Sequence, residues 1–317
     1  MIYLIDAAVY VFRAYHSLPP DMIDRNGNPA HAVFGFARML GDVIERARPK
    51  YMAVAFDHRS VAKCFRNRIY PAYKAHRDPA PADLRYQLER CMELCRCLGV
   101  AALWSDEYEA DDIIGTLVTA FRREGVRSMV ISRDKDLAQL IREGDAYWDF
   151  GSRNPYSYHD ILRHYGVAPE RFADYLALTG DTVDNIPGIP GVGPKTAKLL
   201  MQEFASVDEL YGDLERVSGM KMRGAEALSE RLREHREAAY LARQLTAIAC
   251  DVPLGLGTDG VRRRLPDLAA LASFYDVQQF GPFLRKQGER LAQLPVELGS
   301  VSGIAGAPPP QGQINLF

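Results

Sequence analysis

The stretch Ile2-Tyr3-Leu4-Ile5-Asp6, at the start of this 317-residue chain, is a short apolar run that ends on an acid. The pattern returns at 51–56, where Tyr-Met-Ala-Val-Ala-Phe precedes Asp57, and a further apolar run spans 128–131. Runs without polar alternation are typical of strands buried on both faces. Helical patterns separate them, at about 32–47, 83–98 and 110–123. The sequence therefore predicts an α/β fold with a mostly parallel central sheet flanked by helices.

Acidic residues follow each predicted strand. Asp6 follows the first, Asp57 follows the second, and Asp134 and Asp136 come shortly after the third. Open parallel sheets bind ligands beyond the carboxyl ends of their strands, so we expect these side chains to converge on one crevice. A single acid in this place is commonly a turn or helix-cap residue. Its repetition at three strand ends favours a shared site.

Three more carboxylates stand at the start of the predicted helix 110–123, on Glu109, Asp111 and Asp112. Taken alone, acids in a first helical turn need no purpose beyond complementing the helix dipole. Crowded carboxylates, however, repel one another unless cations neutralise them, and hard divalent ions prefer oxygen ligands. Because the candidate ligands include no histidine, the cluster favours Mg²⁺ or Mn²⁺ over zinc.

Between residues 59 and 77 the chain has six Lys or Arg residues and no Asp or Glu. Aromatic residues are interleaved with these cations. Cations neutralise phosphates and aromatic rings stack on bases, a combination suited to single-stranded nucleic acid. A solvated charged loop is the alternative, but a basic loop that leaves an acidic strand is well placed to close over the crevice. The residues predicted to contact nucleic acid are Lys63, Arg66, Arg68 and Tyr73.

Two features of the second half extend the pattern. Asp181 and Asp184 lie one helical turn apart, and a glycine-rich turn then opens an amphipathic helix near Lys195. Glycines allow close backbone approach, and the unpaired N–H groups of a helix start bind anions. This predicts a grip on a nucleic-acid phosphate, read without regard to base sequence. The residues expected to make it are Gly188, Gly191, Gly193, Lys195, Thr196 and Lys198.

The composition is that of an ordinary soluble protein, with 47% hydrophobic and 25% charged residues and a formal net charge of −2. No segment approaches the roughly 20 apolar residues of a membrane span, and we expect no signal peptide because Asp6 interrupts the first apolar run too early. The cysteines are odd in number, and Cys91, Cys95 and Cys97 lack a fourth metal ligand nearby. We interpret them as buried apolar residues and expect a soluble, cytoplasmic protein without membrane contact.

Several motifs, taken in chain order, resemble those of the 5′-nuclease family, which comprises the flap endonucleases and the 5′-to-3′ exonuclease domain of bacterial DNA polymerase I. The resemblance covers about residues 1 to 290. The motifs are Leu4-Ile5-Asp6, Phe56-Asp57, Tyr108-Glu109-Ala110-Asp111-Asp112, Asp134-Lys135-Asp136, Gly180-Asp181 through Asp184-Asn185, and Gly188 to Ala197.

The resemblance implies a structure-specific 5′ nuclease, both 5′-to-3′ exonuclease and flap endonuclease, that hydrolyses DNA phosphodiesters by two-metal-ion catalysis in primer removal or repair. The substrate would be branched or 5′-ended DNA, including RNA–DNA primers, and the protein a monomer. Three parts are expected: a metal-binding, PIN-like core at 1–156 that includes a basic helical arch at 58–82; a helical DNA-binding subdomain of the helix-hairpin-helix or helix-three-turn-helix type at 157–292, with its hairpin at 186–200; and a flexible tail at 293–317.

The resemblance also implies roles for individual residues. Lys74 and Arg77, in the arch, would reach the scissile phosphate as catalytic residues, and the hairpin would grip the duplex around a K⁺ ion. We expect Asp111 and Asp112 to be direct metal ligands, and Glu109 to be the least direct. One metal ion would be served by Asp6, Asp57, Glu109, Asp111, Asp112 and Asp134, and the second by Asp136, Asp181 and Asp184.

The last five residues suggest a protein partner. Gln313-Ile314-Asn315-Leu316-Phe317 resembles the Gln-x-x-Leu-Phe peptide by which bacterial replication proteins dock on the sliding clamp. The residues expected to bind are Gln313, Ile314, Leu316 and Phe317, and an arbitrary apolar terminus is the alternative. Because the chain stops where polymerase I would continue, we expect a free-standing nuclease that uses this tether instead of a fused polymerase.

Three other functions are compatible with parts of the pattern. A PIN-type ribonuclease shares the acidic parallel sheet but does not need the hairpin. A haloacid-dehalogenase-type phosphatase would need an Asp two residues after Asp6, where Ala8 stands. A DNA-binding scaffold with degraded metal ligands would bind without turnover.

Overall fold

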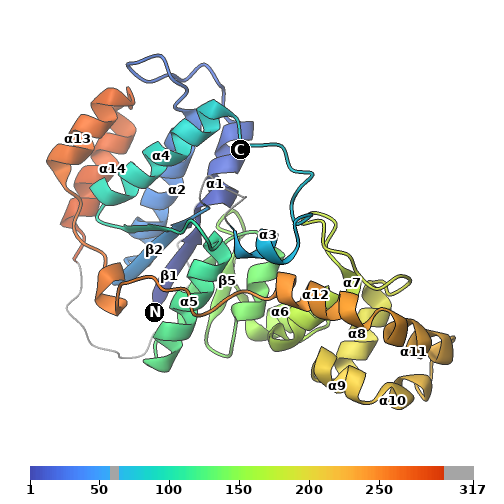
Figure 1. The fold of residues 1–317 in the computed structure, drawn as a ribbon. Coiled ribbons are helices and arrows are strands. Elements are labelled where there is room, and N and C mark those ends of the chain that lie inside the picture. The colour runs from blue at the N-terminus through green and yellow to red at the C-terminus, as the bar shows by residue number, and fades with distance from the viewer. Residues whose placement is uncertain (58–63, 296–317) are drawn as a thin grey trace.

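The computed structural model describes residues 1–57 and 64–295, and its centre is a six-stranded sheet (Figure 1). The strand order is β3-β2-β1-β4-β5-β6, with β1 to β5 parallel and β6 antiparallel to β5. The expected α/β fold is confirmed. The strands are β1 (Ile2–Asp6), β2 (Tyr51–Phe56), β3 (Ala101–Trp104), β4 (Ser128–Ile131), β5 (Ala146–Trp148) and β6 (Tyr156–Ser157).

Both faces of the sheet are covered, which explains why its strands are apolar throughout. Successive side chains of a strand point to opposite faces. Leu4 therefore packs with helix α5 (Ala110–Arg123) and the 3-10 helix η2 (Lys135–Leu140), whereas Ile5 packs with the helices of the other face. The helices of that other face are α1 (Ala7–Ser17), α2 (His31–Ala47) and α4 (Ala82–Cys97).

A second group of helices builds its own apolar core (Figure 1). Leu178, Leu200, Phe204 and Leu232 are among its buried residues. The proline at the start of α8 stands at a position where its missing N–H costs nothing. The elements of this part are α6 (Tyr158–Tyr165), η3 (Pro169–Arg171), α7 (Phe172–Thr179), α8 (Pro194–Glu203), α9 (Val207–Gly212), α10 (Leu214–Ser218), α11 (Ala225–Glu234) and α12 (Arg236–Thr246).

The last described helices correct the predicted boundary of the helical subdomain. After α12 the chain returns to the sheet, where η4 (Thr258–Val261) leads into a β-bridge between Arg262 and Tyr51. Helices α13 (Leu268–Val277) and α14 (Pro282–Gln293) then pack against α4 and α2. Their apolar residues, among them Leu271, Phe274 and Leu284, belong to the core of the sheet and not to that of the helical subdomain. Residues from about 251 to 293 therefore belong with the α/β core.

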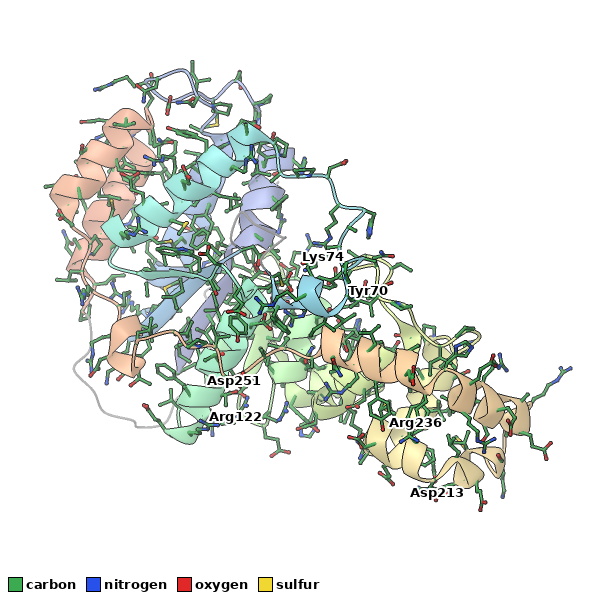
Figure 2. All side chains as sticks on the ribbon, in the orientation of Figure 1. Tyr70, Lys74, Arg122, Asp213, Arg236 and Asp251 are labelled. Atoms are coloured by element: carbon green, nitrogen blue, oxygen red, sulfur yellow. The ribbon has the colours of Figure 1, made fainter. Side chains whose placement is uncertain are left out.

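The described part of the predicted arch connects the two cores. It consists of the short helix α3 (Phe65–Ile69) and a series of turns that lead to α4. Figure 2 shows Tyr70 and Lys74 where the two parts meet. The amide of Lys74 donates to the carbonyl of Asp184 at 3.0 Å, and the Asn185 side chain donates to the carbonyl of Ala72 at 2.7 Å. Lys63 and the predicted clamp peptide lie outside the described residues.

The hairpin between α7 and α8 provides a test of its packing. A Cβ atom at Gly188 would lie 2.3 Å from the Thr179 carbonyl, whereas one at Gly193 would meet nothing within 4 Å. We expect Gly188→Ala to lower the free energy of unfolding by about 1–3 kcal/mol, as overpacking does, and Gly193→Ala to change it by less than about 0.5 kcal/mol. Urea denaturation of the full chain measures both. Equal losses would contradict the close approach.

Candidate functional site

A cavity of about 1550 Å³ opens at the carboxyl ends of the strands. The order of the sheet reverses between β1 and β4, which is where open α/β sheets bind their ligands. The volume of the cavity exceeds the roughly 300–1,000 Å³ that is typical of small-molecule pockets. Among the acids that line it are the predicted site residues Asp6, Asp57, Glu109, Asp111 and Asp134, and the arch residues Lys74 and Arg77 line it as well.

Short hydrogen bonds hold the carboxylates of the strand ends in place. Asp6 caps α1 by accepting from the Ala8 amide at 3.1 Å, and its other oxygen accepts from the Ser132 hydroxyl at 2.9 Å. Ser132 also accepts from the Asp134 amide at 3.0 Å, so it joins the ends of β1 and β4. Asp57 accepts from the Ala110 amide at 2.8 Å, which fixes the start of α5.

Asp136, Asp181 and Asp184 form a second group beside the first. The charges of Asp134, Asp181 and Asp184 all act on Asp136. Its Oδ1 atom is buried and accepts no hydrogen bond among the described residues, although the Lys135 ammonium lies 3.4 Å away. A buried acceptor without a hydrogen bond is costly, so this oxygen is suited to a cation.

Crowding changes the acidity of the carboxyls. Burial and the charge of Asp57 raise the pKa of Asp6 to about 7. Burial and the charge of Asp134 likewise raise the pKa of Asp136 to about 7. The pKa of Asp111 is also well above its ordinary value, because of burial and the charges of Asp134 and Asp6. These carboxyls are held in proximity at an electrostatic cost that cations would relieve.

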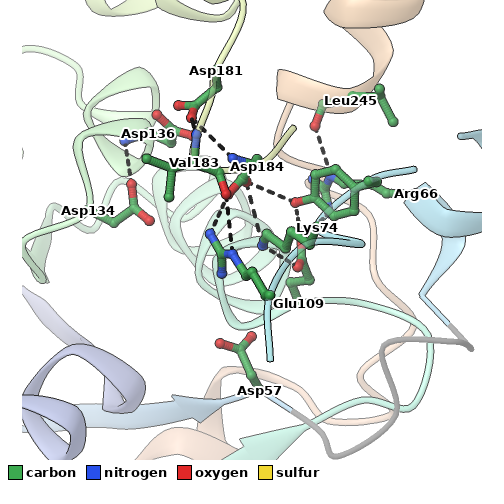
Figure 3. A network of polar contacts seen from close by, with 12 residues as sticks. Asp57, Arg66, Lys74, Glu109, Asp134, Asp136, Asp181, Val183, Asp184 and Leu245 are labelled. Carbon is green, nitrogen blue, oxygen red and sulfur yellow. Dashed lines mark hydrogen bonds and ion pairs between the residues drawn. The ribbon is translucent and has the colours of Figure 1, made fainter. Parts of the chain in front are cut away.

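Side-chain cations from the protein relieve part of that cost (Figure 3). The Lys74 ammonium lies 2.5 Å from Glu109 and 3.5 Å from Asp184, and Arg77 pairs with Asp184 at 2.5 Å. Figure 3 shows these contacts converging on the loop that carries Asp184. Although burial alone would raise the pKa of Glu109, the charges of Lys74 and Arg66 hold it below its ordinary value.

Lys135 plays the same part for the second group of acids. Its ammonium lies 2.5 Å from Asp181. Burial alone would raise the pKa of Asp181, but Lys135 and the amides of Val183 and Asp184 lower it. Lys135 is thus a residue of the site that the sequence analysis missed, because it appeared there only as part of the motif Asp134-Lys135-Asp136.

The donor chemistry fits hard divalent cations, since every candidate ligand is a carboxylate and one buried oxygen lacks a hydrogen bond. Across residues 1–57 and 64–295, however, no three acidic, histidine or cysteine side chains are arranged to hold a metal ion together. Glu109, Asp184 and Asp181 are instead paired with Lys74, Arg77 and Lys135, respectively. Metal binding would therefore require these cations to move aside.

The structure corrects the expectation that Asp112 is a direct metal ligand. Its side chain is fully buried on the inner side of α5. Both carboxylate oxygens are bound by the guanidinium of Arg66, at 2.7 Å each. Adjacent helix positions point about 100° apart, and here Asp111 lines the cavity whereas Asp112 points into the interior.

Two predicted nucleic-acid contacts are corrected as well. Arg66 is 3% exposed and Tyr73 is 2% exposed, so neither offers a surface to DNA. The Tyr73 hydroxyl lies 2.8 Å from Glu109 and 3.1 Å from Asp184, and therefore bridges the two groups of acids. Arg68, in contrast, is exposed and pairs with Glu107.

The hairpin residues divide into packing and exposed positions. Gly188 lies against Thr179, whereas Gly193 and Lys195 are exposed, Thr196 is half-buried and Lys198 runs beside Gly166. Gly191 has a positive φ of 75°, and a Cβ atom there would lie 2.1 Å from the guanidinium of Arg231 on α11. No sequence pattern indicated Arg231, since only the fold brings α11 to the hairpin.

Comparisons with known proteins agree with this geometry. Residues 1–166 match the model of the 5′-3′ exonuclease N-terminal resolvase-like domain, and residues 167–269 match that of the 5′-3′ exonuclease C-terminal SAM fold. A 5′-3′ exonuclease of Aquifex aeolicus is 34% identical over 85% of this chain and 89% of its own length. The chain therefore belongs to the 5′-3′ exonuclease family.

Longer relatives share only part of their length with this chain. DNA polymerase I of Rhizobium leguminosarum is 34% identical over 91% of this chain, which corresponds to 28% of the polymerase. The thermostable DNA polymerase I of Thermus filiformis is 35% identical over 98% of this chain and 35% of its own length. The chain thus spans about a third of the polymerases that it matches.

Solved structures support the fold. A structure of the T5 5′-exonuclease with divalent zinc ions has a TM-score of 0.63 at 20% identity, and covers 93% of this chain and 99% of its own. The catalytic core of Rad2 in complex with a DNA substrate has a TM-score of 0.59 at 15% identity, over 92% of this chain and 91% of its own. In the described part of this chain, no helix is long and apolar enough to cross a membrane.

The raised pKa values of the buried carboxyls predict how stability depends on pH. Folding raises the pKa of Asp136 from 3.8 to about 7. Its contribution to stability is therefore complete below about pH 4 and is lost as the pH rises through 7. In EDTA, we expect the melting temperature of Asp136→Asn to fall less between pH 5 and pH 8 than that of the unmodified protein.

Magnesium should also change how the melting temperature depends on pH. Because protons compete with the cation for these carboxylates, 10 mM Mg²⁺ should raise the melting temperature of the unmodified protein more at pH 8 than at pH 5. Circular dichroism measures both effects. An equal or larger shift at pH 5 would contradict the assignment.

Proposed function

We propose that this chain is a divalent-metal-dependent, structure-specific 5′ nuclease that hydrolyses DNA phosphodiesters as a 5′-to-3′ exonuclease and flap endonuclease. The observation that carries this proposal is the row of five carboxylates along one cavity at the reversal of the sheet, beneath a basic arch segment. The family of the chain supports it, as do neighbours of the same fold. These include the human GEN1 structure with Holliday junction DNA.

We infer that Mg²⁺ or Mn²⁺ serves this site, with two ions per chain. Asp6, Asp57, Asp111 and Asp134 would hold one ion, with Glu109 close by, and Asp136, Asp181 and Asp184 would hold the second. Such ions, when bound, activate water and stabilise the leaving oxygen of a phosphodiester. Asp112 is left out of this set because Arg66 and backbone amides occupy its carboxylate.

The arch cations would serve the chemistry by changing partners. Lys74 and Arg77 neutralise the same carboxylates that metal ions would neutralise. Entry of divalent cations would therefore free both side chains for the scissile phosphate, which brings negative charge into the cavity. In this account the cations hold the acids together in the protein alone and bind the substrate once metal is present.

The hairpin would hold the duplex part of the substrate. The exposed amides at the start of α8, together with Lys195, can bind a backbone phosphate, and Arg231 adds a guanidinium beside Gly191. We also propose a K⁺ ion at this turn. None of these contacts depends on base sequence, so the substrate is selected by its shape, as branched or 5′-ended DNA or an RNA–DNA primer.

We further propose that the protein is a cytoplasmic monomer, active in primer removal or repair, and that residues 313–317 bind the bacterial sliding clamp. A peptide of residues 306–317 should bind the cognate clamp in a titration in which a known clamp ligand also binds. If the peptide does not bind while the known clamp ligand does, the proposal that this chain binds the clamp fails.

The carboxylates are tested by single substitutions. We expect Asp111→Asn and Asp134→Asn each to lower the single-turnover rate on a 5′-labelled flap in Mg²⁺ by at least about 100-fold, because each removes charge from the reacting centre. Asp259→Asn, at a side chain that is 87% exposed near the opposite end of the sheet, is the matched control and should retain the rate. Undiminished cleavage by either site variant would contradict the metal assignment. A comparison of the cleavage rates on matched DNA and RNA flaps tests the alternative of a ribonuclease, which would prefer the RNA flap.

Substitutions of Lys74 and of Lys195 should have opposite effects on the cleavage rate and on the affinity for DNA. We expect Lys74→Ala to lower the single-turnover rate by about 100- to 1,000-fold, since it removes a donor to the developing charge, while the Kd for flap DNA in Ca²⁺ changes little. Lys195→Ala should do the reverse, raising the Kd and lowering its salt dependence, with little change in the rate at saturating protein. The opposite assignment of the two effects would refute these roles.

A further inference from the structure

Arg66 is a buried cation whose five donors are all used. Its Nε donates to the carbonyl of Leu245 at 2.9 Å, and its Nη2 donates to that of Ala247 at 2.8 Å. The remaining three donors reach carboxylates, two on Asp112 at 2.7 Å and one on Glu109 at 3.0 Å. A guanidinium has five N–H groups, so no donor of Arg66 is left for a phosphate.

Asp112 is satisfied to the same degree. Each of its oxygens accepts one bond from Arg66 and one from a backbone amide, that of Glu109 at 3.0 Å and that of Ala249 at 2.8 Å. A buried ion pair with complete hydrogen bonding of this kind is specific in geometry, and loss of one partner leaves a buried charge unpaired.

The pair joins three segments that are distant in the sequence. Arg66 belongs to α3 at the base of the arch, Asp112 to the first turn of α5, and the carbonyls of Leu245 and Ala247 to the end of α12. The side chain of Gln139 closes the same segment by bonding to Thr246 and Ile248, each at 3.1 Å. The base of the arch, the first turn of α5 with its carboxylates, and the end of α12 therefore meet at the guanidinium of Arg66.

Glu109 is where this arrangement reaches the cavity. Its Oε1 accepts from Lys74, whereas its Oε2 accepts from Arg66 and Tyr73. Lys74 is more exposed than Arg66, at 19% against 3%, and its ammonium pairs with Glu109 and Asp184 at the rim of this arrangement. When Lys74 turns to a substrate, Arg66 still holds Glu109.

We propose that Arg66 is a positioning residue that fixes the carboxylate of Glu109 and the first turn of α5, and thereby sets the affinity of the site for divalent cations without touching DNA. This inference rests on the proposed metal-dependent function. Lysine cannot replace arginine here, because three donors on a flexible stem cannot satisfy two carboxylates and two carbonyls in one plane.

The test compares Arg66→Lys with Arg68→Lys, two substitutions on the same short helix. Arg68 is 59% exposed and pairs with the exposed Glu107, so its variant is the matched control. Electron paramagnetic resonance of Mn²⁺ titrations without DNA gives the Kd for the metal, and anisotropy in Ca²⁺ gives the Kd for flap DNA. We expect Arg66→Lys to weaken Mn²⁺ binding by about 10- to 100-fold, as loss of an orienting partner does, and to change the DNA Kd by less than 3-fold. Arg68→Lys should leave the Kd for Mn²⁺ unchanged.

A neutral double variant keeps the proposal testable if Arg66→Lys does not fold. Arg66→Met combined with Asp112→Asn removes both buried charges, which avoids an unpaired one. Thermal unfolding verifies that it folds, and weaker Mn²⁺ binding should persist in it. Unchanged Mn²⁺ affinity in a folded variant, or weaker DNA binding with unchanged Mn²⁺ affinity, would overturn the role of Arg66. If the unmodified protein itself binds no Mn²⁺, the proposed function fails first.

Discussion

Electrostatic repulsion among carboxylates is the constraint on which the rest of this structure depends. Two like charges 4 Å apart cost about 4 kcal/mol at an effective dielectric constant of 20. The fold nevertheless brings acids from three strand ends and one helix start to a single cavity. The repulsion is visible in the pKa values of Asp6 and Asp136, both raised to about 7.

Two kinds of side-chain cation answer this repulsion, and they differ in how firmly they are held. Arg66 is buried and fully hydrogen-bonded, so it is a permanent part of the architecture. Lys74, Arg77 and Lys135 are more exposed, and we propose that they change partners when metal ions bind. The backbone of Lys74 is also bonded to that of Asp184, which joins the arch segment to the loop that carries this acid. This division separates what holds the site together from what would act on a substrate.

The sequence indicated the sheet and most of the carboxylates because both signals are local. An apolar strand followed by an acid is visible without knowing the fold, as at Ile5 and Asp6. The strand β3 was missed, since three of its four residues are only half-buried, Trp104 is exposed, and none of the four is β-branched. The packing of α13 and α14 against the α/β core was missed too, because the amphipathic pattern of a helix does not indicate which apolar surface it covers.

The errors within the site have a similar cause. Adjacent acids such as Asp111 and Asp112 look equivalent in a motif, and their difference depends on which one meets Arg66, 46 positions away. A basic residue in an arch is likewise expected to be exposed because it is charged. The structure, however, buries Arg66 and leaves Arg68 in solvent. Pairing between distant residues is what the local pattern does not contain.

The account claims that the crowded carboxylates of the cavity are a site for divalent cations. Anomalous diffraction at the manganese edge, from crystals grown with MnCl₂, tests this most directly. The account predicts ions among Asp6, Asp57, Asp111 and Asp134 and beside Asp136, with Lys74 displaced from Glu109 and the Arg66–Asp112 pair intact. Crystals without manganese in the cavity, or with manganese bound to Asp112, would contradict it.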